Sequence, residues 1–240
     1  MNALILAGGF STRLYPLTEY KPKALLEVKG QPIIKQVIDG ILSEESIQEI
    51  VLITNNRYFH EFSQYLKNNH LDKRITLLDD GSTSPENRLG ALGDIHFALD
   101  KLHWNEDLLI VASDTLSSLN IQDFVTSFQT DRKIMNAVYD CHDVEIIKGN
   151  LGNPVVEDGM IIKFLEKPAA PESTLVSIPY YIYPKEQLQI FDTYLRQGGN
   201  ADAPGSIISW LIGKIPIRAY SIGDGYYYDV GTHETLEKLQ

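Results

Sequence analysis

Short apolar runs alternate with helix-type patterns through the first half of the chain, and this alternation limits the folds that the chain can adopt. The expected strands are the apolar runs, at Ala3–Leu6, Ile50–Ile53, Ile75–Leu78 and Leu108–Ala112. The expected helices begin at Pro32, cover Tyr58–Leu66, include Ile95 to Leu102 and cover Ile121–Phe128. A strand that is apolar on both faces is typical of a sheet covered by helices on both sides. We therefore expect an α/β fold with a doubly wound, mostly parallel, Rossmann-like sheet.

The second half of the chain has a different pattern, with strand signals that favour antiparallel pairing. Pro154–Glu157 and Met160–Glu166 flank an Asp158-Gly159 turn, which is typical of a hairpin. Further strands are expected at Leu175–Tyr183, Ile217–Ser221 and Tyr226–Asp229, and helices at Lys185–Arg196, at Ile207–Ile212 and from about Glu234. No linker, internal repeat or low-complexity segment divides the chain. We expect a single domain over residues 1–240, with an inserted antiparallel part.

The charge balance argues against nucleic acid as a partner. Asp and Glu number 32 against 21 Lys and Arg, a formal net charge of −11, whereas a duplex-binding protein needs clustered cations. The longest apolar runs are far shorter than the ~20 residues of a membrane-spanning helix, and Met1–Ala7 lacks the basic leader of a signal peptide. Cys141 is the single cysteine, so no internal disulfide can form. These features predict a cytoplasmic protein with no membrane partner.

The loop after the first expected strand concentrates the cations that an anionic ligand would need. Gly8 and Gly9 follow the strand directly, so the backbone there can approach a ligand closely and offer its amides to phosphate. Arg13 can clamp phosphate oxygens in a bidentate fashion, and Lys23 lies in the same loop. This loop is at the carboxyl edge of the predicted sheet, where doubly wound folds bind ligands. A tight turn and a solvated lysine are the structural alternatives.

Several motifs resemble the signature of the sugar-1-phosphate nucleotidylyltransferases, a family that includes synthases similar to glucose-1-phosphate thymidylyltransferase. The first set lies within residues 6–34 and contains Leu6-Ala7-Gly8-Gly9, Thr12-Arg13-Leu14, Pro22-Lys23-Ala24-Leu25-Leu26 and Gly30-Gln31-Pro32-Ile33-Ile34. Later motifs are Arg88-Leu89-Gly90, Ser113-Asp114, Phe164 with Glu166-Lys167-Pro168, and Tyr228-Asp229-Val230-Gly231-Thr232. The resemblance implies a nucleotide-binding half at about 1–130 and a sugar-binding half at about 131–240.

The resemblance also implies an enzyme that joins a nucleoside triphosphate and a sugar 1-phosphate with Mg²⁺, giving an NDP-sugar and pyrophosphate by in-line attack at the α-phosphorus. The attacking phosphate is already an anion, so catalysis would come from positioning and from cations. Arg13 would hold the departing phosphates, and Lys23 those near the reacting centre. The nucleotide would be bound by Ala7, Gly8, Gly9 and Gly90.

The metal and the sugar phosphate are assigned through the same resemblance. Asp114 and Asp229 each lie at the end of an expected strand, and two carboxylates that meet there would hold Mg²⁺. Gly152 and Glu166 would bind the sugar, and Lys167 its phosphate. A cap or a turn is the structural alternative for either aspartate, and a surface ion pair is the alternative for Glu166 and Lys167.

Two departures from the family pattern bear on substrate identity. Leu151-Gly152-Asn153-Pro154 stands where the family usually has Tyr-Gly-Val-Val, and Ser113 replaces the usual asparagine before the metal aspartate. The sugar therefore stays open, as does the oligomeric state, and resemblance alone favours a pyrimidine triphosphate. Two other functions stay open: a cytidylyltransferase for a phosphorylated alcohol, and a non-catalytic regulatory subunit that binds a sugar nucleotide. The residues after Asp229 are too few for the β-helix or helical extension of some relatives, so neither is expected.

Overall fold

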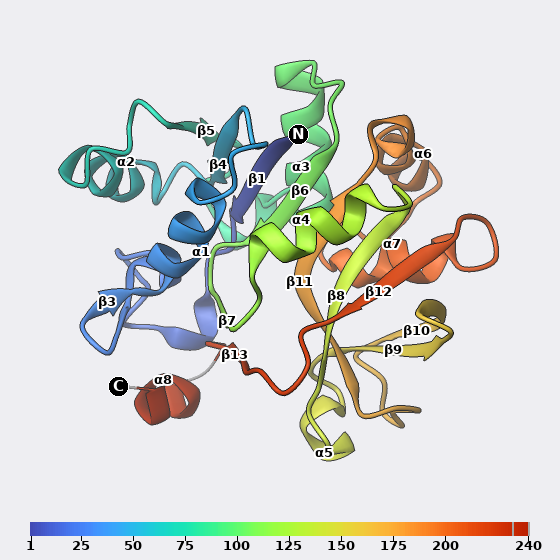
Figure 1. Cartoon of the computed structure of the whole chain (residues 1–240). Coiled ribbons are helices and arrows are strands. Elements are labelled where there is room, and N and C mark those ends of the chain that lie inside the picture. The colour runs from blue at the N-terminus through green and yellow to red at the C-terminus, as the bar shows by residue number, and fades with distance from the viewer. Residues whose placement is uncertain (232, 240) are drawn as a thin grey trace.

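The computed structural model describes residues 1–231 and 233–239, and in this part of the chain the largest element is one mixed sheet of nine strands (Figure 1). The strand order is β5-β4-β1-β6-β11-β8-β12-β10-β9. The strands of this sheet are β1 Asn2–Ala7, β4 Ile50–Thr54, β5 Ile75–Asp79, β6 Leu108–Ala112, β8 Ile134–Asp140, β9 Gly152–Glu157, β10 Met160–Glu166, β11 Leu175–Tyr183 and β12 Ile217–Ser221. Two smaller sheets pair β2 (Glu27–Val28) with β3 (Gln31–Pro32), and β7 (Thr115–Ser117) with β13 (Tyr227–Asp229). The expected α/β class is confirmed.

The four strands on one side of the large sheet are parallel, as the alternation of strands and helices predicts. β1 pairs with β4 on one side and with β6 on the other, and β4 pairs with β5. Successive side chains of a strand point to opposite faces, and both Leu4 and Ile5 of β1 are fully buried. Because the strands run in one direction, their carboxyl ends share one edge of the sheet. Gly8, Asp80 and Ser113 follow β1, β5 and β6 at that edge.

The antiparallel part continues the same sheet. β11 is antiparallel to both β6 and β8, β12 is parallel to β8, and β10 is antiparallel to β12 and to β9. The expected hairpin is β9 with β10, and its turn residues Asp158 and Gly159 both have positive φ. The sequence pattern does not predict β8, because Asn136 interrupts its apolar run.

Asn136 lies in the middle of β8 and is fully buried. Its Nδ2 donates to the carbonyl oxygens of Ile178 at 3.0 Å and Tyr180 at 3.3 Å, and its Oδ1 accepts from Ser177 Oγ at 2.7 Å. The ladder between β8 and β11 changes register between Ser177 and Tyr181. The Asn136 amide therefore supplies hydrogen bonds to backbone carbonyls at the point where the ladder is irregular.

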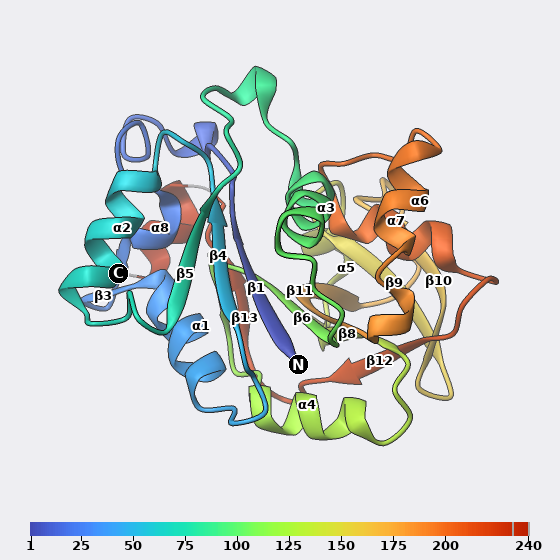
Figure 2. The same cartoon turned by 90° about the horizontal axis from the view of Figure 1, so that it is seen from above.

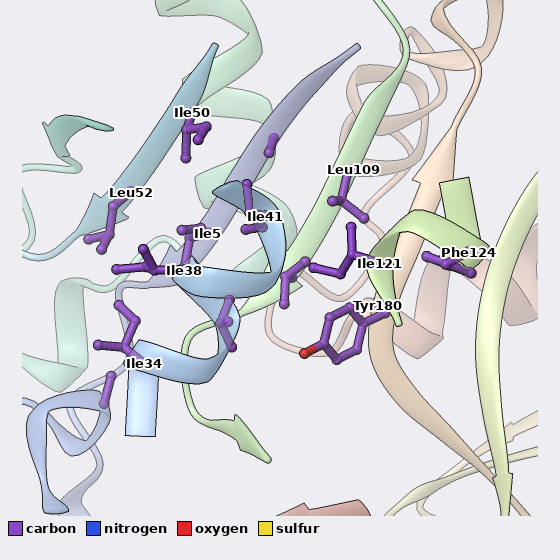
Figure 3. Packing of buried hydrophobic residues seen from close by; sticks show 14 of the residues in the cluster. Ile5, Ile34, Ile38, Ile41, Ile50, Leu52, Leu109, Ile121, Phe124 and Tyr180 are labelled. Atoms are coloured by element: carbon purple, nitrogen blue, oxygen red, sulfur yellow. The ribbon is translucent and has the colours of Figure 1, made fainter. Parts of the chain in front are cut away.

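Helices cover both faces of the sheet (Figure 2). One face carries α1 (Ile33–Leu42), α2 (Phe59–Asn68), α4 (Ile121–Gln129) and the short α5 (Val144–Ile147), and the other carries α3 (Ala91–Leu102), α6 (Ile190–Arg196) and α7 (Pro204–Leu211). Figure 3 shows how Ile34, Ile38 and Ile41 of α1 pack among β1, β4 and α4. Their spacing of three and four residues puts them on one side of the helix, as the sequence pattern predicts.

The predicted helix over Lys185–Arg196 is wrong in its extent. The chain forms a short 3₁₀ turn at Lys185–Gln187 and only then α6. Leu188 and Phe191 are both buried, and Phe191 N donates to Leu188 O across three residues. Side chains three residues apart lie on the same side of a 3₁₀ turn, so this tighter winding suits the burial of both Leu188 and Phe191. The regular α-helix begins only at Ile190.

The last helix, α8 (His233–Leu239), packs beside the loop that follows β1, and its start agrees with the one expected at about Glu234. A small buried cluster joins the two segments: Leu14, Leu26, Ile33, Val230 and Leu236. Among the described residues, no helix has the length and apolar character needed to cross a membrane.

We expect Asn136→Ala to lower the free energy of unfolding by about 2 kcal/mol or more, because each buried carbonyl left without a donor costs about 1–3 kcal/mol. Urea unfolding at neutral pH measures the change. Ser177→Ala is the matched control, since it leaves one buried acceptor, Asn136 Oδ1, without a donor and keeps both carbonyls bonded to Asn136; it should cost about half as much. Equal losses in the two variants would contradict the role given to the amide.

Candidate active site

The loop after β1 carries the two expected cations and is held in place by the segment between β4 and α2. Asn55 Nδ2 donates to the carbonyl oxygen of Gly8 at 3.0 Å. The buried hydroxyl of Tyr58 lies between two carbonyl oxygens of the loop, that of Phe10 at 3.0 Å and that of Thr18. Burial raises the pKa of Tyr58 to about 12, so this hydroxyl stays a donor. These contacts hold the loop at Gly8 and Phe10 on one side of Arg13 and at Thr18 on the other.

Lys23 lies between the two aspartates that are expected to hold a metal. Its Nζ contacts Asp114 Oδ2 and lies 3.6 Å from Asp229 Oδ1. The backbone brings the two carboxylates together, because β13 pairs with β7 so that Asp229 faces Thr115, the residue after Asp114. Only 13% of the Lys23 side chain is exposed. Three residues from distant parts of the sequence thus form one cluster, which we call the Lys23 cluster.

Electrostatic interactions keep Lys23 charged in this cluster. Burial lowers the pKa of Lys23 and so does the Arg13 guanidinium, but the carboxylates of Asp114 and Asp229 outweigh them and leave the pKa above its usual value. An ammonium group that is shielded from water and paired with carboxylates stays a cation at any pH at which the protein would work. The cluster therefore combines a fixed positive charge with two oxygen donors.

Asp114 and Asp229 have the donor chemistry that Mg²⁺ requires. Mg²⁺ prefers oxygen ligands, keeps several waters and is usually bound through one or two carboxylates with substrate phosphates. The described part of the chain contains no group of three or more His, Cys, Asp or Glu side chains that could hold an ion by themselves. The two carboxylates therefore fit an ion whose coordination is completed by phosphate oxygens and water.

Two cavities adjoin the Lys23 cluster. The first, which we call the glycine cavity, has a volume of about 280 Å³, and its lining includes Gly8, Gly9, Gly90 and Asp114. The second, which we call the cationic cavity, has a volume of about 540 Å³, and its lining includes Arg13, Lys167 and Asp229. The expected nucleotide-binding glycines thus lie around one cavity, and the expected phosphate-binding cations around the other. Ala7 is part of β1, where it pairs with Thr54 of β4.

Gly90 has a packing role that the sequence does not reveal. Its φ is +78°, and a Cβ there would lie 2.6 Å from the carbonyl oxygen of Ala201, so only glycine fits. Leu92 N donates to the same carbonyl at 2.8 Å, and Arg88 forms a bidentate pair with Asp202 at 3.0 and 2.8 Å. These contacts join the start of α3 to the segment before α7, and Arg88 and Asp202 both line the glycine cavity.

Two buried aspartates that the motifs do not predict lie against Gly8. Asp80 follows β5 and Asp94 lies in the first turn of α3, and the two residues are 7% and 4% exposed. A Cβ at Gly8 would lie 2.3 Å from Asp94 Oδ2 and 3.1 Å from Asp80 Oδ2, so this position requires glycine. One feature of the sequence could have indicated Asp94: it is a carboxylate on the apolar side of a helix, near Leu92 and Ile95.

The two carboxyl groups interact electrostatically, and this interaction affects the pKa of each. Burial raises the pKa of both, and the Asp80 carboxylate raises that of Asp94 further, to about 8. Asp80 Oδ1 accepts hydrogen bonds from the backbone nitrogen and the hydroxyl of Ser82, both at 2.6 Å, which favours the charged form of Asp80. At neutral pH Asp94 is therefore the protonated member of the pair, and it donates to Asp80.

The expected sugar-binding residues lie at the open end of the β9–β10 hairpin. Gly152 and Glu166 face each other in the ladder. A Cβ at Gly152 would lie 2.7 Å from the Phe164 ring, so packing is sufficient to require this glycine. The Glu166 carboxylate is directed at α7, where a Cβ on Gly205 would lie 2.1 Å from its Oε2. Burial raises the pKa of Glu166, although Lys167 opposes the shift.

Lys167 lines the cationic cavity together with Arg13 and Asp229. Its φ is +48°, a left-handed conformation that residues other than glycine seldom adopt. Such backbone conformations occur often at functional sites, where the surrounding structure enforces them. The structure thus brings Lys167 to the expected phosphate-binding cations, while Glu166 packs towards α7.

Comparison with known proteins identifies the family of the chain. The family model described as Nucleotidyl transferase matches residues 2–240. The mannose-1-phosphate guanylyltransferase catalytic subunit beta of Dictyostelium discoideum is 31% identical over 183 residues, which cover 76% of this chain and 49% of that protein. The UTP–glucose-1-phosphate uridylyltransferase AglF of Haloferax volcanii is 27% identical over 185 residues, covering 76% of this chain and 72% of that protein. The chain spans about half the length of the first curated relatives it matches.

A solved structure shows the same fold. A UDP-glucose pyrophosphorylase complexed with UDP-glucose superposes with a TM-score of 0.80 over 99% of this chain and 96% of the other, at 19% identity. That structural similarity shows the fold, and the match of the family model over residues 2–240 shows the family. The predicted resemblance is therefore confirmed, and the chain belongs to the nucleotidyl transferase family, whose members include sugar-1-phosphate nucleotidyltransferases.

Proposed function

We propose that this protein transfers a nucleoside monophosphate unit from a nucleoside triphosphate to a sugar 1-phosphate and releases pyrophosphate. The observation that carries the proposal is the Lys23 cluster, in which Lys23 contacts Asp114 and lies 3.6 Å from Asp229. One of these aspartates lines the glycine cavity and the other the cationic cavity. Two substrates held in the two cavities would therefore meet at the cluster.

The reaction makes one phosphorus–oxygen bond and breaks another. A phosphate oxygen of the sugar 1-phosphate attacks the α-phosphorus, and the bond from that phosphorus to the bridging oxygen of pyrophosphate breaks, so pyrophosphate leaves with the electron pair. The attacking oxygen is already negative, so no general base has to remove a proton. The main barriers are repulsion between two polyanions and the charge that grows on the leaving group, and fixed cations lower both.

The cations of the site have separate tasks in this proposal. Lys23 is buried and charged, so it neutralises the phosphate groups at the reacting centre without needing to reorganise. Arg13 lines the cationic cavity and binds the departing phosphates with its planar guanidinium. Lys167 lines the same cavity and holds the sugar phosphate close to the line of attack.

Asp114 and Asp229 would hold Mg²⁺ in the proposed reaction. When bound there, the ion supplies charge that offsets the phosphate oxygens and helps to orient the triphosphate. The two residues contribute carboxylates whose spacing is set by the β7–β13 ladder. The adjacent Lys23 ammonium limits the negative charge that the pair presents to a polyanionic substrate.

The relatives are named for different sugar 1-phosphates and different bases, so their names indicate the class of substrate and not the individual sugar or base. Relatives of this chain are named for mannose 1-phosphate with guanylyl transfer and for glucose 1-phosphate with uridylyl transfer. We therefore propose a hexose 1-phosphate as the acceptor. Glu166, partly buried at the end of β10, would accept hydrogen bonds from sugar hydroxyls beside Gly152.

We expect pyrophosphate release that requires Mg²⁺ and both substrates, and that falls by about a hundredfold or more in kcat/KM when Lys23→Ala or Asp114→Asn removes a charged group at the reacting centre. A coupled pyrophosphate assay measures this across the common nucleoside triphosphates and a panel of sugar 1-phosphates. Lys21→Ala is the matched control, because Lys21 carries the same charge in the same loop but is exposed; its kcat/KM should match that of the unmodified protein.

Three results would count against this proposal. Equal losses in Lys21→Ala and Lys23→Ala would show that general charge, and not the Lys23 cluster, supports the reaction. Tight binding of a sugar nucleotide, with no turnover of any substrate pair, would identify the chain as a non-catalytic binding subunit. A phosphorylated alcohol that reacts faster than every sugar 1-phosphate would replace the acceptor class proposed above.

Substitutions of the two adjacent glycines should separate packing from nucleotide binding. Gly8→Ala places a Cβ against Asp94 Oδ2, so it should lower the free energy of unfolding by about 1–3 kcal/mol. Gly9 lines the glycine cavity and has open space where a Cβ would be, so Gly9→Ala should leave stability unchanged and weaken nucleotide binding about tenfold. Thermal unfolding and calorimetric titration measure the two effects, and unaltered nucleotide affinity in Gly9→Ala would move the nucleotide out of this cavity.

A further inference from the structure

The Lys23 cluster carries less negative charge than its two carboxylates alone would give it. Lys23 Nζ contacts Asp114 Oδ2 and lies 3.6 Å from Asp229 Oδ1. Two carboxylates and one ammonium leave one net negative charge. Because only 13% of the Lys23 side chain is exposed, salt and water screen this ammonium poorly. A divalent ion that approaches the two carboxylates therefore meets a cation already placed between them.

Further cations lie on the Asp229 side of the cluster. Arg13 and Lys167 line the cationic cavity together with Asp229. Among the described residues, the lining of this cavity contains no other carboxylate. Counted with Lys23, three cations therefore stand against the two carboxylates of Asp114 and Asp229 at this end of the site.

The carboxylates on the Asp114 side change this balance little. Asp202 lines the glycine cavity but forms a bidentate pair with Arg88. Asp94 lines the same cavity, and burial together with Asp80 raises the pKa of Asp94 to about 8, so it is protonated at neutral pH. Asp80 itself follows β5, three strands away from β6 in the sheet. The surroundings of the Lys23 cluster therefore do not restore the negative charge that a divalent ion needs.

A triphosphate supplies what the cluster lacks. Its phosphates bring several negative charges and further oxygen ligands, and Mg²⁺ is usually bound through one or two carboxylates together with substrate phosphates. The same phosphates can pair with the cations Lys23, Arg13 and Lys167. With a triphosphate in place, the repulsion between the Lys23 ammonium and the metal ion is therefore offset by the added negative charge.

We propose that the Lys23 ammonium keeps free divalent metal ions from binding to Asp114 and Asp229, so that the metal ion binds only together with a triphosphate. Even at the dielectric constant of water, a single and a double positive charge about 4 Å apart repel each other enough to weaken binding about tenfold or more. The metal ion and the triphosphate then tighten each other's binding by the same factor. The inference rests on the metal role proposed above for the two aspartates, and it gives Lys23 a task separate from the transfer step.

Binding of Mn²⁺, as a substitute for Mg²⁺, to the whole chain tests this without turnover. Inorganic triphosphate is the second ligand, because the argument concerns charge and not the base, and no sugar phosphate is added. Equilibrium dialysis measures the Mn²⁺ retained by the protein at each free Mn²⁺ concentration. We expect the unmodified protein to bind Mn²⁺ at least about tenfold more tightly with triphosphate than without it. Equal affinity in the two conditions would overturn the proposal, and this comparison requires no variant that has to fold.

Substitutions of Lys23 test the role of its charge. Without triphosphate, Lys23→Met should bind Mn²⁺ about tenfold or more tightly than the unmodified protein, because the repulsive ammonium is gone. Lys23→Arg keeps the positive charge and should bind Mn²⁺ as weakly as the unmodified protein. Lys21→Met is the matched control, since Lys21 is an exposed lysine of the same loop, and it should leave the affinity unchanged. Adding Asp114→Asn to Lys23→Met should abolish the gain.

Three further results would contradict the proposal. No gain in Lys23→Met would mean that the ammonium does not exclude the ion. An equal gain in Lys21→Met would show a general effect of the charge of the protein. A gain that survives Asp114→Asn would place the ion at another site. Because none of these measurements requires a reaction, they succeed or fail independently of the pyrophosphate assay, which tests the transfer itself.

Discussion

The contact of Lys23 with Asp114 and Asp229 is the interaction on which the whole site depends. It joins the loop after β1, the end of β6 and the short strand β13, which lie far apart in the sequence. A charged lysine that is largely shielded from water needs its carboxylate partners, and loss of one partner leaves an uncompensated charge. The same contact therefore holds these three segments together. It also gathers the charged groups that a reaction between two polyanions would require.

The architecture of the sheet explains why two substrates could meet at this point. The parallel side, β5-β4-β1-β6, ends its strands along one edge, and the antiparallel side continues from β11 through β9 without a second layer. β6 is the last strand of the parallel side and pairs antiparallel with β11, so Asp114 lies at the border between the two sides. The Arg88–Asp202 pair and the hydrogen bond from Leu92 N to the Ala201 carbonyl join the start of α3 to the segment before α7.

Much of the fold can be predicted from local sequence patterns. Where the prediction fails, the physical cause can be identified. The apolar runs and the Asp158-Gly159 turn predict strands and a hairpin that the structure contains, whereas β8 escapes prediction because Asn136 satisfies backbone groups that no sequence pattern displays. The motifs predict where Lys23, Asp114 and Lys167 would gather, but not that Lys23 lies between two carboxylates. Asp94 looks like an ordinary helix residue until tertiary packing places it against Gly8. At Gly90 and Gly152, packing alone is sufficient to require glycine, so these two glycines do not by themselves indicate a ligand.

The joint role of Asp114 and Asp229 is tested most directly by counting bound metal. Mn²⁺ can stand in for Mg²⁺ at an oxygen-donor site, and electron paramagnetic resonance distinguishes free from bound ion. With a nucleoside triphosphate present and no sugar phosphate, we predict one tightly bound Mn²⁺ per chain, weakened at least about tenfold by Asp114→Asn and by Asp229→Asn alike. The same Mn²⁺ affinity in the unmodified protein and in both variants would contradict a shared ion and would leave the two carboxylates as partners of Lys23 alone.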